Sequence, residues 1–276
     1  MHNLEFQQRS IESIFLEVLD DLSKKEVLLM VLCYVQLVRR ENNFEVSLSD
    51  LIRCSEKPHR RIKGDWRDIM MEIDIFYVNE EDKLYEGKDV FKIQDVSQAR
   101  VSIANVYKPD FNEVSNLITK YWNIVSRLSS FSDGNYVEKK VSTVALLFNE
   151  QLYKECISYA NMLREASQNI ANVRFSPADA LFFDAIIDAC FSVEFYQKNL
   201  PDRAKDYAKN AFDKLSRIET YYDLNLKEFT KQLNLFFKKP QKQKSKEFPK
   251  LYTKRHKAKN ANIFSRLLNK IKEFFK

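Results

Sequence analysis

The chain has 276 residues with 45 Lys or Arg and 39 Asp or Glu, which gives a net charge of +6 at pH 7. Average glycine usage predicts about 19 glycines in such a chain, but there are three, Gly64, Gly87 and Gly134. Three isolated glycines cannot form a dinucleotide-binding fingerprint, a P-loop or a nucleophile elbow. The histidines and cysteines have neither Cys-x-x-Cys nor His-x-x-x-His spacing, which excludes the usual zinc motifs.

The positive charge is concentrated toward the C-terminal end. Residues 238–276 hold 14 Lys or Arg and two acids, Glu247 and Glu273, a net charge of +12. The remaining residues have a net charge of −6. We expect such a basic tail to meet nucleic acid, an anionic membrane or an acidic protein face.

The apolar runs and the cysteines indicate a cytoplasmic protein. Residues 1–10 are polar, and the longest apolar run, residues 27–35, is far shorter than the roughly 20 residues that span a bilayer. Four widely spaced cysteines lie mostly in apolar helical runs. They predict buried, reduced thiols and no disulfide framework.

The first hundred residues alternate helical and strand patterns. Residues 10–22 have helical periodicity. Ser23 with Glu26 three positions later is typical of a capping box, and predicts a second helix that continues to about Arg40. The elements expected next are a short strand at 44–47, a helix at 47–54, a helix from Pro58 to about Asp74, and a strand pair at 75–78 and 90–93.

This order of elements is that of a winged helix, and the sequence supports it. The segments SLSDLI (47–52), RIKGDWRDI (61–69) and IFYV (75–78) resemble the winged helix-turn-helix of DeoR-like bacterial regulators. The resemblance implies a DNA-recognition helix followed by a wing. Gly64 stands where the family has an arginine, at a cost of about 1 kcal/mol in helix propensity, and Asp74 stands where it has a glycine.

The rest of the chain predicts a second, helical domain. Residues 101–110 have the composition of a linker, and residues 111–128 have helical periodicity around Trp122. The turn at 132–135 is followed by two expected helix pairs, 139–148 with 151–166 and 176–197 with 201–222. The segments 144–156 and 201–208 loosely resemble tetratricopeptide-repeat hairpins, which implies a helical-repeat domain.

A basic cluster lies at the start of the expected recognition helix, where winged helices contact DNA. Residues 1–100 nevertheless hold 15 Lys or Arg against 20 Asp or Glu, so the alternative is a solvated helix face in a winged helix used for protein contacts. The candidate nucleic-acid-binding residues of this cluster are Lys57, His59, Arg60, Arg61, Lys63 and Arg67.

The basic tail supplies a second set of candidates. Residues 238–262 are interpreted as a flexible basic linker, and residues 263–276 as an amphipathic helix. That helix is expected to dock on the helical domain or a partner, or to bind a membrane surface as a less favoured alternative. The candidate phosphate-binding residues of the tail are Lys250, Lys254, Arg255, Lys257 and Lys259.

Together these patterns predict a mainly α protein in five parts. The leading hypothesis is a non-enzymatic DNA-binding (or RNA-binding) regulator of transcription whose helical domain mediates protein interaction or dimerisation. The alternative is a protein-interaction adaptor with no role in nucleic-acid binding. The predicted parts are a winged-helix domain at 1–100, a linker at 101–110, a helical-hairpin domain resembling tetratricopeptide repeats at 111–237, the basic linker at 238–262 and the amphipathic helix at 263–276.

A nuclease is the third hypothesis. Arg53 and His59 have the spacing of the Arg-x(4–6)-His motif of HEPN-type ribonucleases, although Pro58 interrupts the helix between them. Asp74 with Glu86, Gly87 and Lys88 has the residue types of a metal-dependent nuclease core, but in a short charged wing. No catalytic residue, cofactor or metal ligand is predicted.

Overall fold

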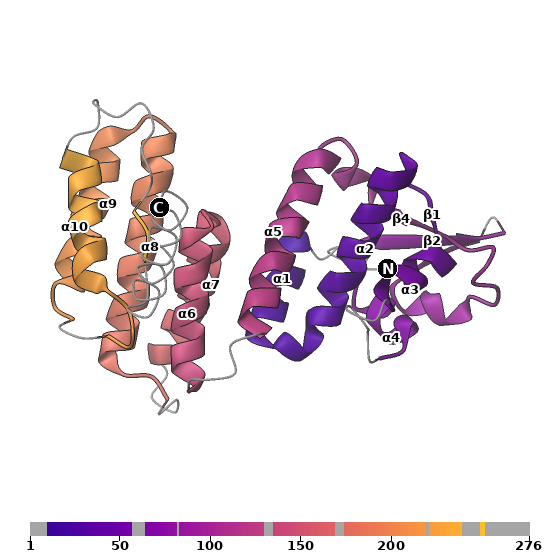
Figure 1. The fold of residues 1–276 in the computed structure, drawn as a ribbon, viewed down its shortest axis with the longest axis horizontal. Coiled ribbons are helices and arrows are strands. Elements are labelled where there is room, and N and C mark those ends of the chain that lie inside the picture. The colour runs from indigo at the N-terminus through magenta and orange to yellow at the C-terminus, as the bar shows by residue number, and fades with distance from the viewer. Residues whose placement is uncertain are drawn as a thin grey trace, which may run out of the picture. The chain divides into compact units, whose positions relative to one another are not determined.

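The computed structural model of the chain describes residues 10–56, 64–81, 83–129, 135–168, 174–218, 221–238 and 249–251. Across these residues the protein is mainly helical, as the sequence predicts, with one small four-stranded antiparallel sheet (Figure 1). The chain divides into two compact units, residues 1–132 and residues 133–276, which we call the N-terminal unit and the C-terminal unit.

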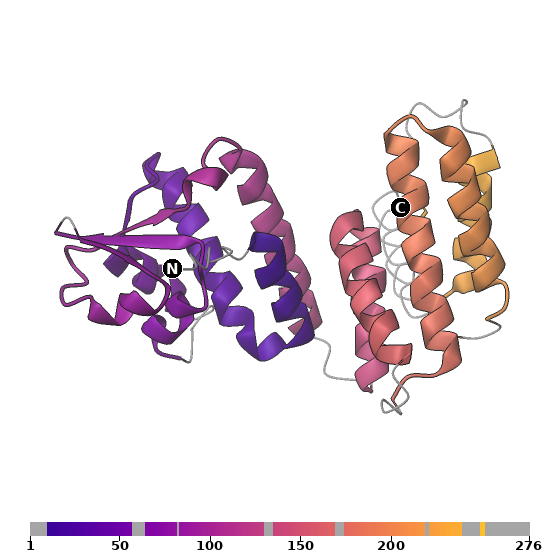
Figure 2. The same cartoon turned by 180° about the vertical axis from the view of Figure 1, so that it is seen from behind.

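The N-terminal unit is built around one buried helix. Helix α2 is apolar on nearly every side, so it must pack against neighbours all round. Helices α1 and α5 pack on it, as do α3, α4 and the sheet (Figures 1 and 2). The helices of this unit are α1 (Ile11–Asp20), α2 (Lys25–Glu41), α3 (Leu48–Ser55), α4 (Trp66–Met71) and α5 (Phe111–Ser129), with 3₁₀ turns η1 (Leu22–Lys24), η2 (Gly87–Lys92) and η3 (Asn105–Tyr107).

The two ends of this unit meet through aromatic packing. The rings of Phe15 on α1 and Tyr121 on α5 stack with centroids 3.7 Å apart. Helix α5 therefore belongs to the N-terminal unit, and the predicted boundary that assigned residues 111–128 to the second domain is wrong. The change of unit falls at 132/133, beside the predicted turn at 132–135.

The predicted start of α2 is also corrected. Ser23 caps no helix; its backbone N–H and its hydroxyl both donate to the Asp21 carboxylate, at 3.0 and 2.7 Å, within η1. The N-cap of α2 is Lys24, which makes no side-chain capping bond. Ser23 therefore bonds within a local turn and does not cap α2, as the capping-box pattern predicted it would.

The sheet joins strands that are far apart in sequence. Its order is β1-β4-β2-β3, and all neighbouring strands are antiparallel. The Tyr34 hydroxyl ties α2 to it, donating to the carbonyl of Phe44 at 2.7 Å and accepting the N–H of Ile103 at 2.9 Å. The strands are β1 (Val46–Ser47), β2 (Phe76–Glu80), β3 (Lys83–Glu86) and β4 (Arg100–Ile103).

Two strand predictions are wrong. Residues 90–93, expected to pair with 75–78, lie mostly in η2, and β2 pairs with β3 and β4 instead. Residues 101–103, expected in a linker, form β4, a central strand with Val101 and Ile103 fully buried. Burial against Tyr34 and β2 makes this short segment a strand, and that contact is not visible in local sequence.

The C-terminal unit consists of antiparallel helices, of which α6 and α7 are joined by three residues, as are α8 and α9. Ser176 caps α8 and forms a capping box with Asp179, and Pro177 is the first helical residue. Helix α9 ends at Leu215, earlier than the expected residue 222, and a further helix, α10, follows. The helices are α6 (Tyr136–Asn149), α7 (Tyr153–Gln168), α8 (Pro177–Gln197), α9 (Pro201–Leu215) and α10 (Leu226–Lys238).

The last described residues return to the first helix of this unit. Asn149, at the end of α6, makes two hydrogen bonds to the backbone of Leu251, its Oδ1 accepting at 2.7 Å and its Nδ2 donating at 2.8 Å. The Phe148 and Phe229 rings join α6 to α10 with centroids 5.2 Å apart. Leu251 is 1% exposed, so residues 249–251, predicted within a flexible linker, are held on the folded unit.

Helix ends without glycine use other residues in the left-handed conformation. Asn42 follows α2 with φ 51°, Gln151 follows α6 with φ 60° and Asn199 follows α8 with φ 57°. Among the described glycines, Gly87 has positive φ and Gly64 does not. The four cysteines are free and buried, as predicted. No helix in the described part of the chain is long and apolar enough to cross a membrane.

Candidate nucleic-acid interface

Two of the eleven predicted nucleic-acid-binding residues lie in the described part of the chain. These are Arg67, on α4, and Lys250, beside Leu251. The nine that lie outside the described residues are Lys57, His59, Arg60, Arg61, Lys63, Lys254, Arg255, Lys257 and Lys259.

Arg67 lies in the first turn of α4. The carboxylate of Asp65 caps this helix and accepts the Arg67 backbone N–H at 2.9 Å. The Arg67 guanidinium lies over the indole ring of Trp66, 4.5 Å from the ring centroid. Stacking on an aromatic face leaves the donors at the guanidinium edge able to bind an anion. Among the described residues, no carboxylate pairs with this guanidinium.

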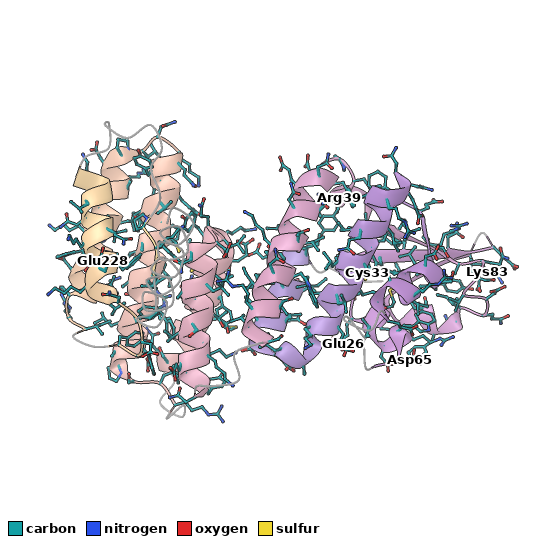
Figure 3. All side chains as sticks on the ribbon, in the orientation of Figure 1. Glu26, Cys33, Arg39, Asp65, Lys83 and Glu228 are labelled. Carbon is teal, nitrogen blue, oxygen red and sulfur yellow. The ribbon has the colours of Figure 1, made fainter. Side chains whose placement is uncertain are left out.

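The residues on either side of the basic segment 57–63, Glu56 and Gly64, are held by hydrogen bonds. Glu56 closes α3, with its N–H donating to the carbonyl of Ile52 at 3.1 Å. Gly64 donates its N–H to the carboxylate of Glu26 on α2 at 3.2 Å, and Asp65 then starts α4 (Figure 3). Gly64 thus lies before α4 and outside any described helix. Its predicted cost inside a recognition helix does not arise there.

Acidic partners neutralise several other cations of this unit. Arg53, named in the ribonuclease comparison, lies 3.4 Å from Asp50. A hydrogen bond from Lys92 to Asp89 raises the pKa of the Lys92 ammonium. Within the described residues, cations without an ion-pair partner in this unit include Arg67, Arg100 and Lys83, the last at the tip of the β2–β3 hairpin (Figure 3).

The last residue of β2, Glu80, is a buried glutamate that holds the loop after η2. Glu80 is 7% exposed, and its carboxylate accepts the backbone N–H groups of Gln94 and Asp95 and the hydroxyl of Tyr85. Burial, and then the charge of Glu80, raise the pKa of Tyr85. Glu80 therefore anchors the 93–95 loop, a role that local sequence reading assigned to no residue.

Lys250 precedes Leu251, the last described residue of the chain. Its N–H donates to Gln232 on α10 at 3.1 Å, and its side chain is half-buried. The cluster that starts at Lys254 is therefore three residues beyond Leu251.

Sequence reasoning missed a charged network that joins three helices of the C-terminal unit. Lys214 on α9 lies 2.6 Å from Asp184 and 2.7 Å from Asp188, both on α8, and Arg164 on α7 lies 3.0 Å from Asp184. Burial raises the pKa of Asp188, while hydrogen bonds from Lys214 and Arg164 outweigh burial and lower the pKa of Asp184. The spacing of the two aspartates, four residues apart, was the available signal.

The nuclease hypothesis finds no assembled site in the described residues. His59 lies outside them, as does the side chain of Lys88. Asp74 precedes β2 in a turn, and Glu86 ends β3 on the exposed side of the sheet. No group of three or more His, Cys, Asp or Glu in the part that the structure describes is arranged to hold a metal ion.

Comparison with known proteins finds a relative that covers most of the chain. No family model matches the chain, and no solved structure matches it. A protein of Aquifex aeolicus (strain VF5), described as uncharacterized, is 30% identical over 265 residues, which cover 95% of this chain and 82% of the relative. The alignment therefore includes both units, and the chain belongs to the same family as this Aquifex aeolicus protein.

Proposed function

We propose that the N-terminal unit is a winged helix that binds nucleic acid, DNA in the first instance, and catalyses no reaction. Segment 57–63 and Arg67 contact the duplex, and the basic tail adds phosphate contacts. The C-terminal unit, whose paired helices resemble tetratricopeptide hairpins, binds a protein partner. The protein acts as a regulator rather than an enzyme.

The strand order of the sheet is the observation that carries the proposal. In a winged helix, a short first strand precedes two helices and then pairs with the returning strand of the wing. Here β1 precedes α3 and α4, and pairs with β4, which pairs with β2. Strand β3 and turn η2 then form an insertion between the two wing strands.

The position of the basic segment supports contact with DNA. In helix-turn-helix proteins the start of the second helix meets base edges and phosphates in the major groove. Segment 57–63 ends two residues before the N-terminal end of α4, separated from it by Gly64 and Asp65, and five of its seven residues are Lys, Arg or His. Glu56 and Gly64, the residues on either side of this segment, are both held by hydrogen bonds.

The charge balance explains why the tail is part of the proposal. Residues 1–132 hold 18 Lys or Arg and 22 Asp or Glu, so the N-terminal unit as a whole repels a polyanion. Phosphate contacts supply much of the affinity for nucleic acid. The tail, with 14 cations and two acids in residues 238–276, offsets that deficit.

Fluorescence anisotropy with labelled random-sequence duplex, single-stranded DNA and RNA tests the proposal. We expect duplex binding at about 50 mM salt that weakens steeply by about 200 mM. The double variant R60A/R61A and a chain ending at Leu251 should each bind at least about tenfold more weakly, since each removes phosphate contacts. Ending at Leu251 keeps the residue that contacts Asn149.

The matched control removes two cations from another exposed surface. Lys205→Ala with Lys209→Ala on α9 makes the same change in charge as R60A/R61A, and should leave affinity nearly unchanged. If truncation abolishes binding while R60A/R61A has no effect, the winged helix does not contact the nucleic acid. If nothing binds at about 50 mM salt, where the electrostatic attraction is strong, the proposal is wrong.

The second candidate function is a protein-interaction adaptor with no role in nucleic-acid binding. The negative net charge of the N-terminal unit and its exposed apolar side chains Leu84 and Val106 favour it. It predicts no anisotropy change with any of the three nucleic acids at low salt. The same titration therefore decides between the two functions.

A further inference from the structure

The outer face of the small sheet combines apolar and charged side chains. The register places Tyr77 of β2 between Ser102 of β4 and Glu86 of β3. The next row has Asn79 of β2 between Arg100 of β4 and Leu84 of β3. Side chains on successive residues of a strand alternate between faces. Phe76, Val78, Val101 and Ile103 are buried on the other face.

This outer face has two exposed apolar side chains and a shallow groove. Leu84 is 66% exposed and Val106 is 70% exposed. Both line a groove of about 480 Å³ with Tyr77, Ser102, Ala104 and Asn105. Exposed apolar side chains that line one groove form a small apolar patch, which a second protein surface can cover.

The charges on this face are of opposite sign and symmetrically placed. Arg100 lies on β4 and Glu86 on β3, so they flank β2 on opposite sides and in different rows. Neither has an ion-pair partner among the described residues. A nucleic acid requires an excess of cations, which this face lacks. A two-fold contact requires a face that complements itself, and one cation diagonally opposite one anion meets that condition.

We propose that two copies of the chain associate through this face, with the outer surfaces of the two sheets packed together. The two-fold axis passes near Tyr77 and Asn79, which places Arg100 of each copy opposite Glu86 of the other. Leu84 and Val106 then leave water at the centre of the contact. The inference does not depend on nucleic-acid binding and is tested without any nucleic acid.

Sedimentation equilibrium of the full chain, from about 1 to about 100 µM, measures the association. We expect the mass to rise with concentration from 32.8 kDa toward twice that value. Leu84→Glu should raise the dissociation constant at least about tenfold, because it brings two buried charges to the centre of the contact. Leu84 is exposed in the isolated unit, so this variant should fold.

Charge reversal gives the sharper test. Arg100→Glu and Glu86→Arg should each weaken association at least about tenfold, since each sets like charges opposite one another. The double variant R100E/E86R restores opposite charges, and should return the dissociation constant to within about threefold of the original. Lys120→Glu, an exposed cation on α5, is the control and should change nothing.

Three outcomes would overturn the proposal. The first is a mass of 32.8 kDa at every concentration. The second is association that Leu84→Glu and both charge reversals leave unchanged, which would put the contact on another surface. The third is a double variant R100E/E86R that associates no more tightly than either single variant. Circular dichroism of each variant verifies its helix content, so loss of folding is not taken for loss of association.

Discussion

Asp184 and Asp188 share one lysine but differ in what their charges contribute to stability. The pKa of Asp184 is lowered in the folded protein, so its ionised form stabilises the fold above its ordinary pKa of 3.8. That contribution is lost as the pH falls through the lower, folded-state pKa. The pKa of Asp188 is raised by burial, so its ionised form opposes folding at neutral pH.

Isosteric substitution should therefore separate the two carboxylates. Asp184→Asn should lower the free energy of unfolding by about 1–2 kcal/mol at pH 7, because it weakens charge-assisted hydrogen bonds to Lys214 and Arg164. The loss should shrink as the pH falls below 3.8. Asp188→Asn, the matched control, should cost less at pH 7. Urea unfolding followed by circular dichroism measures both, and equal losses at pH 7 would contradict the assignment.

At the scale of the secondary-structure elements, residues 249–251 hold helices α6 and α10 together. Leu251 is buried, and Asn149 bonds to both its N–H and its carbonyl. Leu251→Ala should destabilise the C-terminal unit by about 2–4 kcal/mol through lost burial and a residual cavity. The control, Leu235→Ala on α10, removes a side chain that is 56% exposed and should change stability by about 0.5 kcal/mol at most.

Urea unfolding followed by circular dichroism also measures these two variants. If Leu251→Ala costs no more than Leu235→Ala, residues 249–251 do not brace the helices. A shift in the Leu251→Ala transition toward lower urea, with the Leu235→Ala transition unmoved, is the expected result.

The elements that were predictable from sequence are those with strong local signals. Helix α8 has a Ser176 cap and Pro177, and α5 has clear periodicity, so both were located to within a few residues. Strand β4 was missed because four residues with exposed Arg100 and half-buried Ser102 become a strand only when β1 and β2 pair with them. The charged network at Asp184 and Asp188 was harder to predict, because its cations lie on other helices, α7 and α9, that are distant in sequence.

For the whole molecule, the two tryptophans offer a way to follow one unit alone. Trp66 and Trp122 both lie in the N-terminal unit, so tryptophan fluorescence reports its unfolding, whereas circular dichroism reports both units. We expect the two urea transitions not to coincide, because each unit has its own core. Leu251→Ala should move the circular-dichroism transition and leave the fluorescence transition in place. Coincident transitions in the original chain would mean that the units unfold together.

The left-handed residues at the helix ends affect the unfolded chain as well as the folded one. Asn42, Gln151 and Asn199 occupy a conformation that glycine adopts without steric cost, so each adds local strain to the native state. A chain with three glycines in 276 residues also has fewer backbone conformations to lose on folding. The two effects oppose each other: the native turns are strained, and the disordered chain is stiffer. Part of the resistance of this protein to unfolding therefore arises from the restricted backbone of the unfolded chain rather than from any contact in the folded one.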